Sequence, residues 1–293
     1  MNIRARDHAS RPHWLTIMVA AGLAIPIRAA FAQPASTASV RDLVSAIGSY
    51  VESYGQRASG VVSTERYSQT VTGHRLLGPT GRLTVGEFAI VKGSVSEPWI
   101  GFRDVIEVDG HPLTDHRDRL LSILTAPSAD LDAARRLSTE SARFNIGPIE
   151  RNFNVPTTAL FFFEPENLGR FAFKIEARGK NGQVRIGFRE IGTPTMIQTS
   201  GGGAAPSEGE LLVDGDGLVH QTILRTHVFS QSMASWIYST VDVQYERLDP
   251  MGMWLPTVMT EAYATLGRSE GVRIETRADY SNYRRFETSV KIR

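Results

Sequence analysis

The chain has 293 residues, 41% of them hydrophobic, with a net charge of +1 at pH 7 and no cysteine. This length can bury a sizeable core in one large domain. The absence of cysteine excludes disulfides, thiol chemistry and a lipid anchor on the chain's own thiol. The balanced charge lacks the basic surplus that nucleic-acid binding requires, so we expect no nucleic-acid partner.

Residues 1–32 are predicted to be a secretory signal peptide. Their start is basic, Leu15 to Ile25 is apolar, and Ala30-Phe31-Ala32 supplies the small residues found before a cleavage site. The apolar stretch is shorter than the about 20 residues of a membrane span, so we expect cleavage and no stable membrane span afterwards. The mature chain, 33–293, is expected to be exported to the periplasm or out of the cell.

The first part of the mature chain is predicted to contain one helix and three strands. Ser39 is suited to cap a helix in which apolar residues recur at helical spacing from Val40 to Tyr54. Strands are predicted over 61–71, 82–92 and 99–110, the last one running into a turn.

The hydrophobic period then changes to that of helices. Helices are predicted over 117–125, 129–144 and 157–163.

From Phe171 onward, apolar and polar residues alternate with the period of strands. Asp214-Gly-Asp-Gly217 is typical of a tight hairpin turn, and 201–206 of a loop. Strands followed by helices and more strands predict an α+β fold, a bent antiparallel β-sheet (half-open barrel) with helices packed on the concave face. One domain over 33–293 is expected, with two domains meeting near residue 150 as the alternative. The predicted strands are 171–178, 183–191, 195–199, 210–213, 218–229, 235–248, 254–267 and 271–283.

Three C-terminal motifs carry a resemblance to known proteins. They are Leu218-Val-His-Gln-Thr222 after a turn, Tyr245 to Pro256 with its Trp254-Leu-Pro256 end, and Ala278-Asp-Tyr-Ser-Asn-Tyr-Arg-Arg-Phe286. Together they are similar to uncharacterised exported bacterial proteins, and they resemble the tail of the outer-membrane lipoprotein-sorting superfamily (LolA/LolB/RseB-like).

This resemblance implies a half-open barrel whose helices plug the concave side, where acyl chains or lipoproteins are held. It covers roughly 208–286 by motif and the rest by order of elements. A helical insert over 116–165 departs from a minimal carrier of that kind.

Patterns typical of metal sites are incomplete. The histidines show no His-Glu-x-x-His spacing, with His111 and His116 around a proline and His220 and His227 on opposite faces of one strand. Asp214 resembles the start of a calcium loop whose other ligands are missing, so a hairpin turn explains it. We therefore expect no metal and no cofactor.

Patterns typical of hydrolases are also weak. No Gly-x-Ser-x-Gly motif occurs. The acid pairs Glu164/Glu166 and Glu208/Glu210 have the spacing that chance produces among many acids, and a glycosidase pair depends on a separation in space. No catalytic residue is predicted.

Aromatic residues give the strongest indication of a binding site. Phe161-Phe162-Phe163 lie on one short helix, so the three rings cannot all face one side of it. With rings on later strands they could line an apolar cavity, or they could fill a solid core. The candidate ligand-lining residues are Phe161, Phe162, Phe163, Phe171, Phe173, Phe188, Trp236, Trp254 and Tyr263.

The sequence therefore favours an exported, non-catalytic periplasmic protein that binds an apolar ligand, which would be an acyl chain, a lipid or a lipoprotein segment. Helix 157–163 and its flanking loop 145–156 would form the lid. An envelope scaffold that binds a protein partner through an open strand edge, and an exported carboxylate-dependent hydrolase, are the alternatives. The sequence predicts no particular oligomeric state.

Overall fold

The computed structural model describes most of the chain after residue 37. The predicted signal peptide over 1–32, together with His74 and His116, lies outside the described residues, and the predicted domain boundaries stay a prediction. The described residues belong to one compact unit. The described residues are 38–73, 78–92, 99–114, 119–125, 131–151, 153–199, 202–267 and 271–286.

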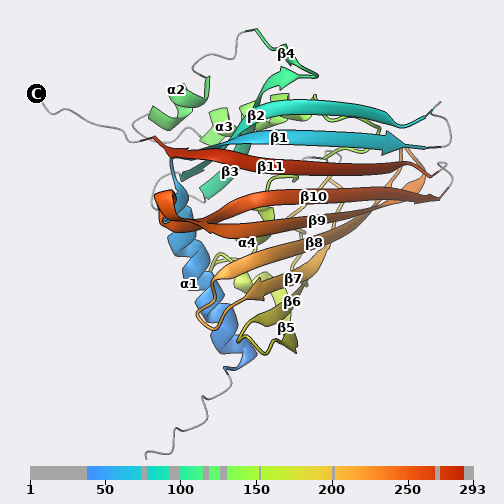
Figure 1. Ribbon diagram of the computed structural model, residues 1–293. Helices are drawn as coiled ribbons and strands as arrows, with labels where there is room; N and C mark the ends of the chain where they lie inside the picture. The colour runs from blue at the N-terminus through green and yellow to red at the C-terminus, as the bar shows by residue number, and fades with distance from the viewer. Residues whose placement is uncertain are drawn as a thin grey trace, which may run out of the picture. The chain divides into compact units, whose positions relative to one another are not determined.

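Within these ranges, eleven strands form a single antiparallel sheet in the order β4-β3-β2-β1-β11-β10-β9-β8-β7-β6-β5 (Figure 1). The two edge strands, β4 and β5, do not pair with each other, so the sheet stays open. Pairing of β1 with β11 joins the early strands to the C-terminal meander. The strands are β1 (Val61–Thr72), β2 (Thr80–Lys92), β3 (Trp99–Val108), β4 (His111–Pro112), β5 (Phe171–Arg178), β6 (Val184–Glu190), β7 (Ser207–Val213), β8 (Val219–Ser230), β9 (Ser235–Leu248), β10 (Met253–Gly267) and β11 (Arg273–Arg285).

Helix α1 (Val40–Ala58) begins at the predicted cap. The Ser39 hydroxyl accepts a hydrogen bond from the Asp42 amide at 3.2 Å, and the Asp42 carboxylate accepts one from the Ser39 amide at 3.0 Å. This capping box satisfies two amides at the helix start. The buried residues of α1 recur every three or four positions and include Leu43, Ile47, Val51 and Tyr54, which form its sheet-facing side.

The helices cover two faces of the sheet. We call concave the face on which α1 and α4 (Thr158–Phe161) pack, with Tyr67 and Phe88 of the sheet in the same core. Helices α2 (Arg119–Thr125) and α3 (Leu131–Ala142) pack against Val62 and Ala89, which point to the opposite face of β1 and β2. The predicted α+β fold with an open, bent antiparallel sheet is therefore confirmed. Among the residues the structure describes, no helix combines the length and apolar character needed to cross a membrane.

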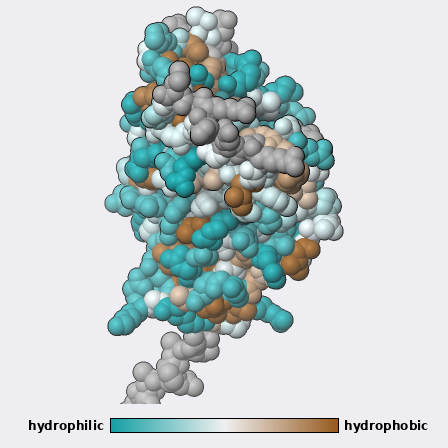
Figure 2. All heavy atoms as spheres, turned by 90° about the vertical axis from the view of Figure 1, so that its right-hand side faces the viewer, coloured by the Kyte–Doolittle hydropathy of each residue, from teal (hydrophilic) through white to brown (hydrophobic). Residues whose placement is uncertain are grey.

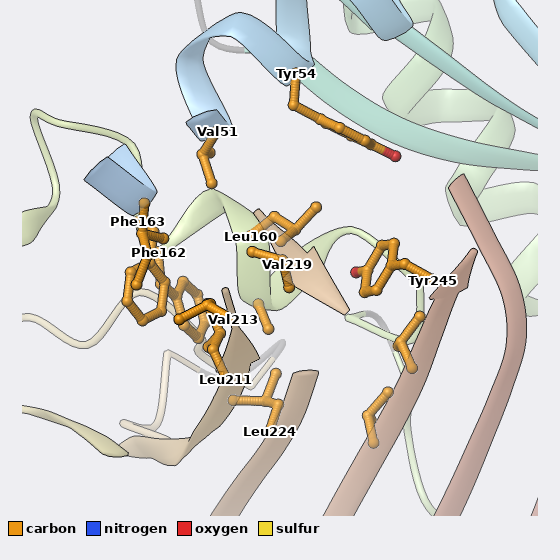
Figure 3. Close-up of a cluster of buried hydrophobic side chains, with 14 of the residues drawn as sticks. Val51, Tyr54, Leu160, Phe162, Phe163, Leu211, Val213, Val219, Leu224 and Tyr245 are labelled. Atoms are coloured by element: carbon orange, nitrogen blue, oxygen red, sulfur yellow. The ribbon is translucent and has the colours of Figure 1, made fainter. Parts of the chain in front are cut away.

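The main core lies between the concave face, α1 and the segment around α4. Figure 3 shows Val51 and Tyr54 of α1 facing Leu160, with strand residues such as Leu211 and Tyr245 completing the cluster. Leu160 is fully buried, which fits a short helix held by tertiary packing and not by its own length.

The β7–β8 turn packs directly on α1. Asp214 Oδ1 accepts hydrogen bonds from the amides of Asp216 at 3.0 Å and Leu218 at 3.1 Å. Gly217 adopts a φ of +81°, and a Cβ at this position would lie 2.6 Å from the carbonyl carbon of Ala46. Only glycine therefore fits both the turn and its contact with the helix.

The predicted strand over 195–199 is wrong. This segment forms a loop in which Gln198 makes one isolated bridge with Ala204. Because β6 and β7 pair directly with each other, the segment that connects them does not enter the sheet between them. The other predicted helices and strands form, with ends shifted by a few residues. Two short 3-10 helices, η1 (Leu168–Arg170) and η2 (Asp249–Met251), complete the chain's regular elements within the described ranges.

Candidate functional site

Five of the nine predicted aromatic residues pack against one another in the main core. Phe162 lies 5.2 Å from Phe171 and 6.1 Å from Phe188, measured between ring centroids. Phe163 lies 5.4 Å from Phe173 and 5.5 Å from Phe188. These rings fill the space between the α4 segment and β5–β6 by contacting each other.

The remaining four candidates lie in separate places. Phe161 meets Trp99 edge-on at 6.5 Å. Trp236 is 43% exposed beside Phe229 near the β8–β9 turn, and Trp254 packs on His220 at 4.5 Å near α1. The nine rings therefore do not line one common cavity. Whether any of them contacts a ligand stays a prediction.

Tyr263, the ninth, lies in the wall of a pocket of about 440 Å³, which we call the end pocket. One wall is the concave face of β8, β9 and β10 near the β8–β9 turn, and the others come from the segments 148–153 and 197–205. Figure 2 views the molecule from the end at which this turn lies, where apolar residues show as separate patches among hydrophilic ones. The apolar side chains that line the pocket include Ile149, Phe153, Ile197, Val228, Met233 and Ile237.

Beside Val228 and Ile237, the sheet wall of the end pocket contains a row of polar groups on three neighbouring strands. Thr226 pairs with Ser239, and Ser239 pairs with Tyr263. The hydroxyl oxygens of Thr226 and Ser239 are 2.5 Å apart and hydrogen-bonded. Next to this row, Tyr263 donates a hydrogen bond to Glu261, which is 3% exposed.

A set of charged and polar side chains is buried beside this wall, and we call it the buried polar cluster. Arg103 of β3 donates to both carboxylate oxygens of Glu65, with Nη2–Oε1 at 2.7 Å, and also to the carbonyl of Asn154 at 3.0 Å. Its guanidinium carbon lies 4.8 Å from the ring centroid of Tyr67. The cluster comprises Glu65, Tyr67, Gln69, Arg103, Arg151, Asn154, Glu261 and Tyr263.

Arg151 holds the loop at 145–156 against β1. Its two Nη atoms donate to Tyr67 OH at 3.2 Å, Gln69 Oε1 at 2.8 Å and the carbonyl of Ile146 at 2.9 Å. Asn154 adds a hydrogen bond to Tyr67 OH at 3.2 Å. Lifting the loop would break these hydrogen bonds and leave buried polar groups of β1 without partners, so the loop wall of the end pocket is preformed.

Burial changes the protonation behaviour of this cluster. It raises the pKa of Glu261 above the usual 4.5, although the hydrogen bond from Tyr263 and the charges of Arg103 and Arg151 oppose the rise. Burial also raises the pKa of Tyr67 and of Tyr263. Burial alone would lower the pKa of Arg103, but Glu65 beside it raises that pKa well above its usual value. Arg103 therefore stays charged.

The sequence contained an unused signal for this cluster. Glu65 and Gln69 alternate with exposed residues in phase with the apolar Val61, Tyr67 and Val71, which places them on the buried face of β1. Glu261 likewise stands in phase with Met259 and Tyr263 of β10. A charged residue on an apolar strand face indicates a buried polar contact.

The other predicted chemical candidates have structural roles or lie apart. Trp99 donates a hydrogen bond to Glu164, and burial raises the pKa of the Glu164 carboxyl group. Glu210 forms ion pairs with Arg185 at 3.1 Å and with Arg225 at 3.2 Å. Glu208 and Glu210 face a separate groove of about 470 Å³ on the outer side of β5–β8, which Phe173 and Phe188 also border. Within the part of the chain that is described, no three His, Asp or Glu side chains are placed to hold a metal ion.

No family model matches the chain, and no curated protein does. Among solved structures, the chain is similar to an outer membrane lipoprotein-sorting protein domain from Vibrio parahaemolyticus, with 14% identity over 84% of this chain and 94% of that one, at a TM-score of 0.36. A DUF1329 family protein from Desulfovibrio piger matches with 11% identity over 87% and 95% of the two chains, at a TM-score of 0.35.

A LolA superfamily protein from Nitrosomonas europaea matches with 10% identity over 84% of this chain and 96% of that one, at a TM-score of 0.29. Lipoprotein-sorting and LolA superfamily structures are thus among those that this chain resembles, as the sequence predicted.

Proposed function

We propose that this protein is an exported, non-catalytic binding protein of the periplasm that holds an apolar ligand, such as an acyl chain, a lipid or a lipoprotein segment, in the end pocket. The observation that carries the proposal is the pocket itself, with about 440 Å³ between the concave face and a loop held by the hydrogen bonds of Arg151. Ligand pockets typically span about 300–1,000 Å³ and are usually preformed.

The lining of the end pocket suits a ligand with an apolar body. Ile149, Val228 and Ile237 come from a loop and two strands and present aliphatic surface to the same space. Each methylene group that leaves water for such a surface gains about 0.8 kcal/mol. A short chain segment therefore provides enough binding free energy for a carrier that must later release its ligand.

The two parts of the predicted lid, the loop at 145–156 and the helix at 157–163, lie at different sites in the structure. In the loop at 145–156, Ile149 and Phe153 border the end pocket. The α4 segment instead buries Phe162 in the main core, where it is 2% exposed. Replacing Phe162 by a charged residue would unfold the chain, so the test of binding belongs at the end pocket.

Two tryptophan substitutions test the proposal. Ile237→Trp places a large ring inside the end pocket. Ile223→Trp adds the same ring on the opposite face of the sheet and serves as the control. Mass spectrometry of natively purified wild type is expected to show a bound apolar molecule. A fluorescent acyl probe should bind wild type and Ile223→Trp, and Ile237→Trp should lose it while melting cooperatively.

Equal probe binding by the two folded variants would contradict the end pocket as the binding site. Protein that purifies free of lipid from cell envelopes and binds no acyl probe would contradict the proposed function itself. Detection of the mature chain in the cytoplasmic fraction alone would contradict export.

A further inference from the structure

The end pocket presents hydrogen-bonding groups but no positive charge among the described residues that line it. Among the described lining residues, the polar side chains are hydroxyls and amides, and Glu150 is the one residue with a formal charge. The hydroxyls of Thr226 and Ser239, which are 5% and 6% exposed, lie in the sheet wall. The polar end of a ligand would therefore meet neutral donors and acceptors, with one carboxylate nearby.

The guanidinium of Arg151 packs on the wall of this pocket, but its Nη atoms form hydrogen bonds with residues outside the pocket lining. Its guanidinium carbon lies 5.6 Å from the ring centroid of Tyr263, and its Nη atoms donate to Tyr67, Gln69 and Ile146. The side chain is 1% exposed and does not line the pocket. It cannot turn to a ligand without breaking the contacts that hold the loop.

This distribution of charge separates two classes of amphiphile. A carboxylate or phosphate that enters the pocket would lose its hydration without gaining a cation, and burial of an unpaired charge is strongly unfavourable. A hydroxyl or ester group would exchange water for hydrogen bonds with Thr226, Ser239 or the amide side chains.

Building on the proposed function, we propose that the end pocket selects uncharged amphiphiles, lipids whose polar end is a hydroxyl or an ester, and rejects the corresponding anions. The selection follows from the neutral sheet wall and from the hydrogen bonds that hold the Arg151 guanidinium against the loop and β1.

A matched pair of ligands tests this selection. Dodecanol and dodecanoate have the same chain and differ in the charge of one end, provided that the fatty acid is ionised (about pH 8). Dodecanol is used below its solubility limit and dodecanoate below its micelle concentration, and each displaces a neutral fluorescent lipid probe from the wild-type protein. Dodecanol is expected to displace the probe at a concentration at least about tenfold lower than dodecanoate, which corresponds to about 1.4 kcal/mol.

A substitution that adds a cation gives the converse test. Gln231 borders the pocket at the β8–β9 turn, and Gln244 is exposed on the outer face of β9. Gln231→Lys should lower the ratio of the dodecanoate to the dodecanol displacement concentration several-fold, while Gln244→Lys should leave both concentrations unchanged.

The possible failures are distinguishable. If wild type binds dodecanoate as tightly as dodecanol, the selection for uncharged amphiphiles is overturned and the proposed function stands. If neither ligand displaces the probe, or no probe binds, the proposed function fails and the selection fails with it.

Discussion

Tyr263 donates a hydrogen bond to Glu261, and this contact joins the wall of the end pocket to the buried polar cluster. The two residues are two positions apart on β10, so both side chains leave the same face of the sheet. Glu261 Oε1 has no hydrogen-bond partner among the described residues and is buried. A ligand that moves Tyr263 would therefore act on a carboxyl group that water does not reach.

Glu261 is expected to make stability depend on pH. Burial raises its pKa in the folded protein above the usual 4.5. Protonation of Glu261 therefore contributes its full stabilisation of the fold at pH values below 4.5. This contribution is lost as the pH rises through the folded pKa. Glu261→Gln should therefore gain stability relative to wild type at neutral pH and gain less in acid.

Urea unfolding across a pH series measures this difference. Glu275→Gln is the control, because the Glu275 side chain is 62% exposed in a surface ion pair with Arg273. An unchanged pH profile in Glu261→Gln would show that the carboxyl group does not titrate in this range.

Removing Arg103 should unpair a buried carboxylate. The Arg103 and Glu65 side chains are 7% and 1% exposed, and breaking a buried pair by removing one partner costs about 3–5 kcal/mol. Arg103→Met is expected to lower the free energy of unfolding by that amount, and Glu65→Gln combined with it should restore part of the loss. Arg277→Met, which breaks an exposed pair with Asp279, should cost about 1 kcal/mol or less. Similar losses for the two single variants would contradict the assignment.

Gly217 should not tolerate a side chain. Its φ of +81° costs about 1–2 kcal/mol for an L-residue, and a Cβ would meet the α1 backbone at Ala46. Gly217→Ala is expected to lower the melting temperature by several degrees in calorimetry. Gly215 lies in the same turn, and no atom is within 4 Å of a Cβ added there. Gly215→Ala should therefore leave the melting temperature nearly unchanged. Equal melting temperatures for the two variants would refute the contact with α1.

The predicted aromatic residues should separate into those that stabilise the fold and those that do not. Phe162 is 2% exposed among other rings, so Phe162→Ala should cost about 3–5 kcal/mol in denaturant unfolding. Trp236 is 43% exposed on the outer face, and Trp236→Ala should cost about 1 kcal/mol or less. The reverse order of these losses would mean that the core is packed differently.

Much of the fold was predictable because its signals are local. Ser39 and Asp42 form a capping box three residues apart, and the period-2 pattern from Phe171 onward specifies strands whatever their neighbours are. The segment at 195–199 shows the limit of such signals. It has the composition of a strand, but it connects two strands that pair directly with each other and makes one isolated bridge of its own.

The candidate site was less predictable because its parts are far apart in the chain. The end pocket takes Ile149 from a loop, Thr226 and Ser239 from a hairpin, and Tyr263 from a later strand. Of the nine aromatic candidates, Tyr263 lies in its wall, while the rings around Phe162 contact each other. Hydrophobicity marks a residue as buried, but it does not distinguish a filled core from the rim of a cavity.

Apart from the segment 195–199, the amino-acid sequence by itself determined the helices and strands and which side of the C-terminal strands is apolar, since periods of 3.6 and 2 residues arise from the local backbone. The tertiary structure alone decided which buried faces meet. Pairing of Tyr67 with Ala278 across β1 and β11 sets one register in the sheet, and the ion pair of Arg103 with Glu65 holds β3 to β1. Together with the loop that Arg151 pins, these long-range contacts leave a pocket at one end of the sheet and a solid core at the other.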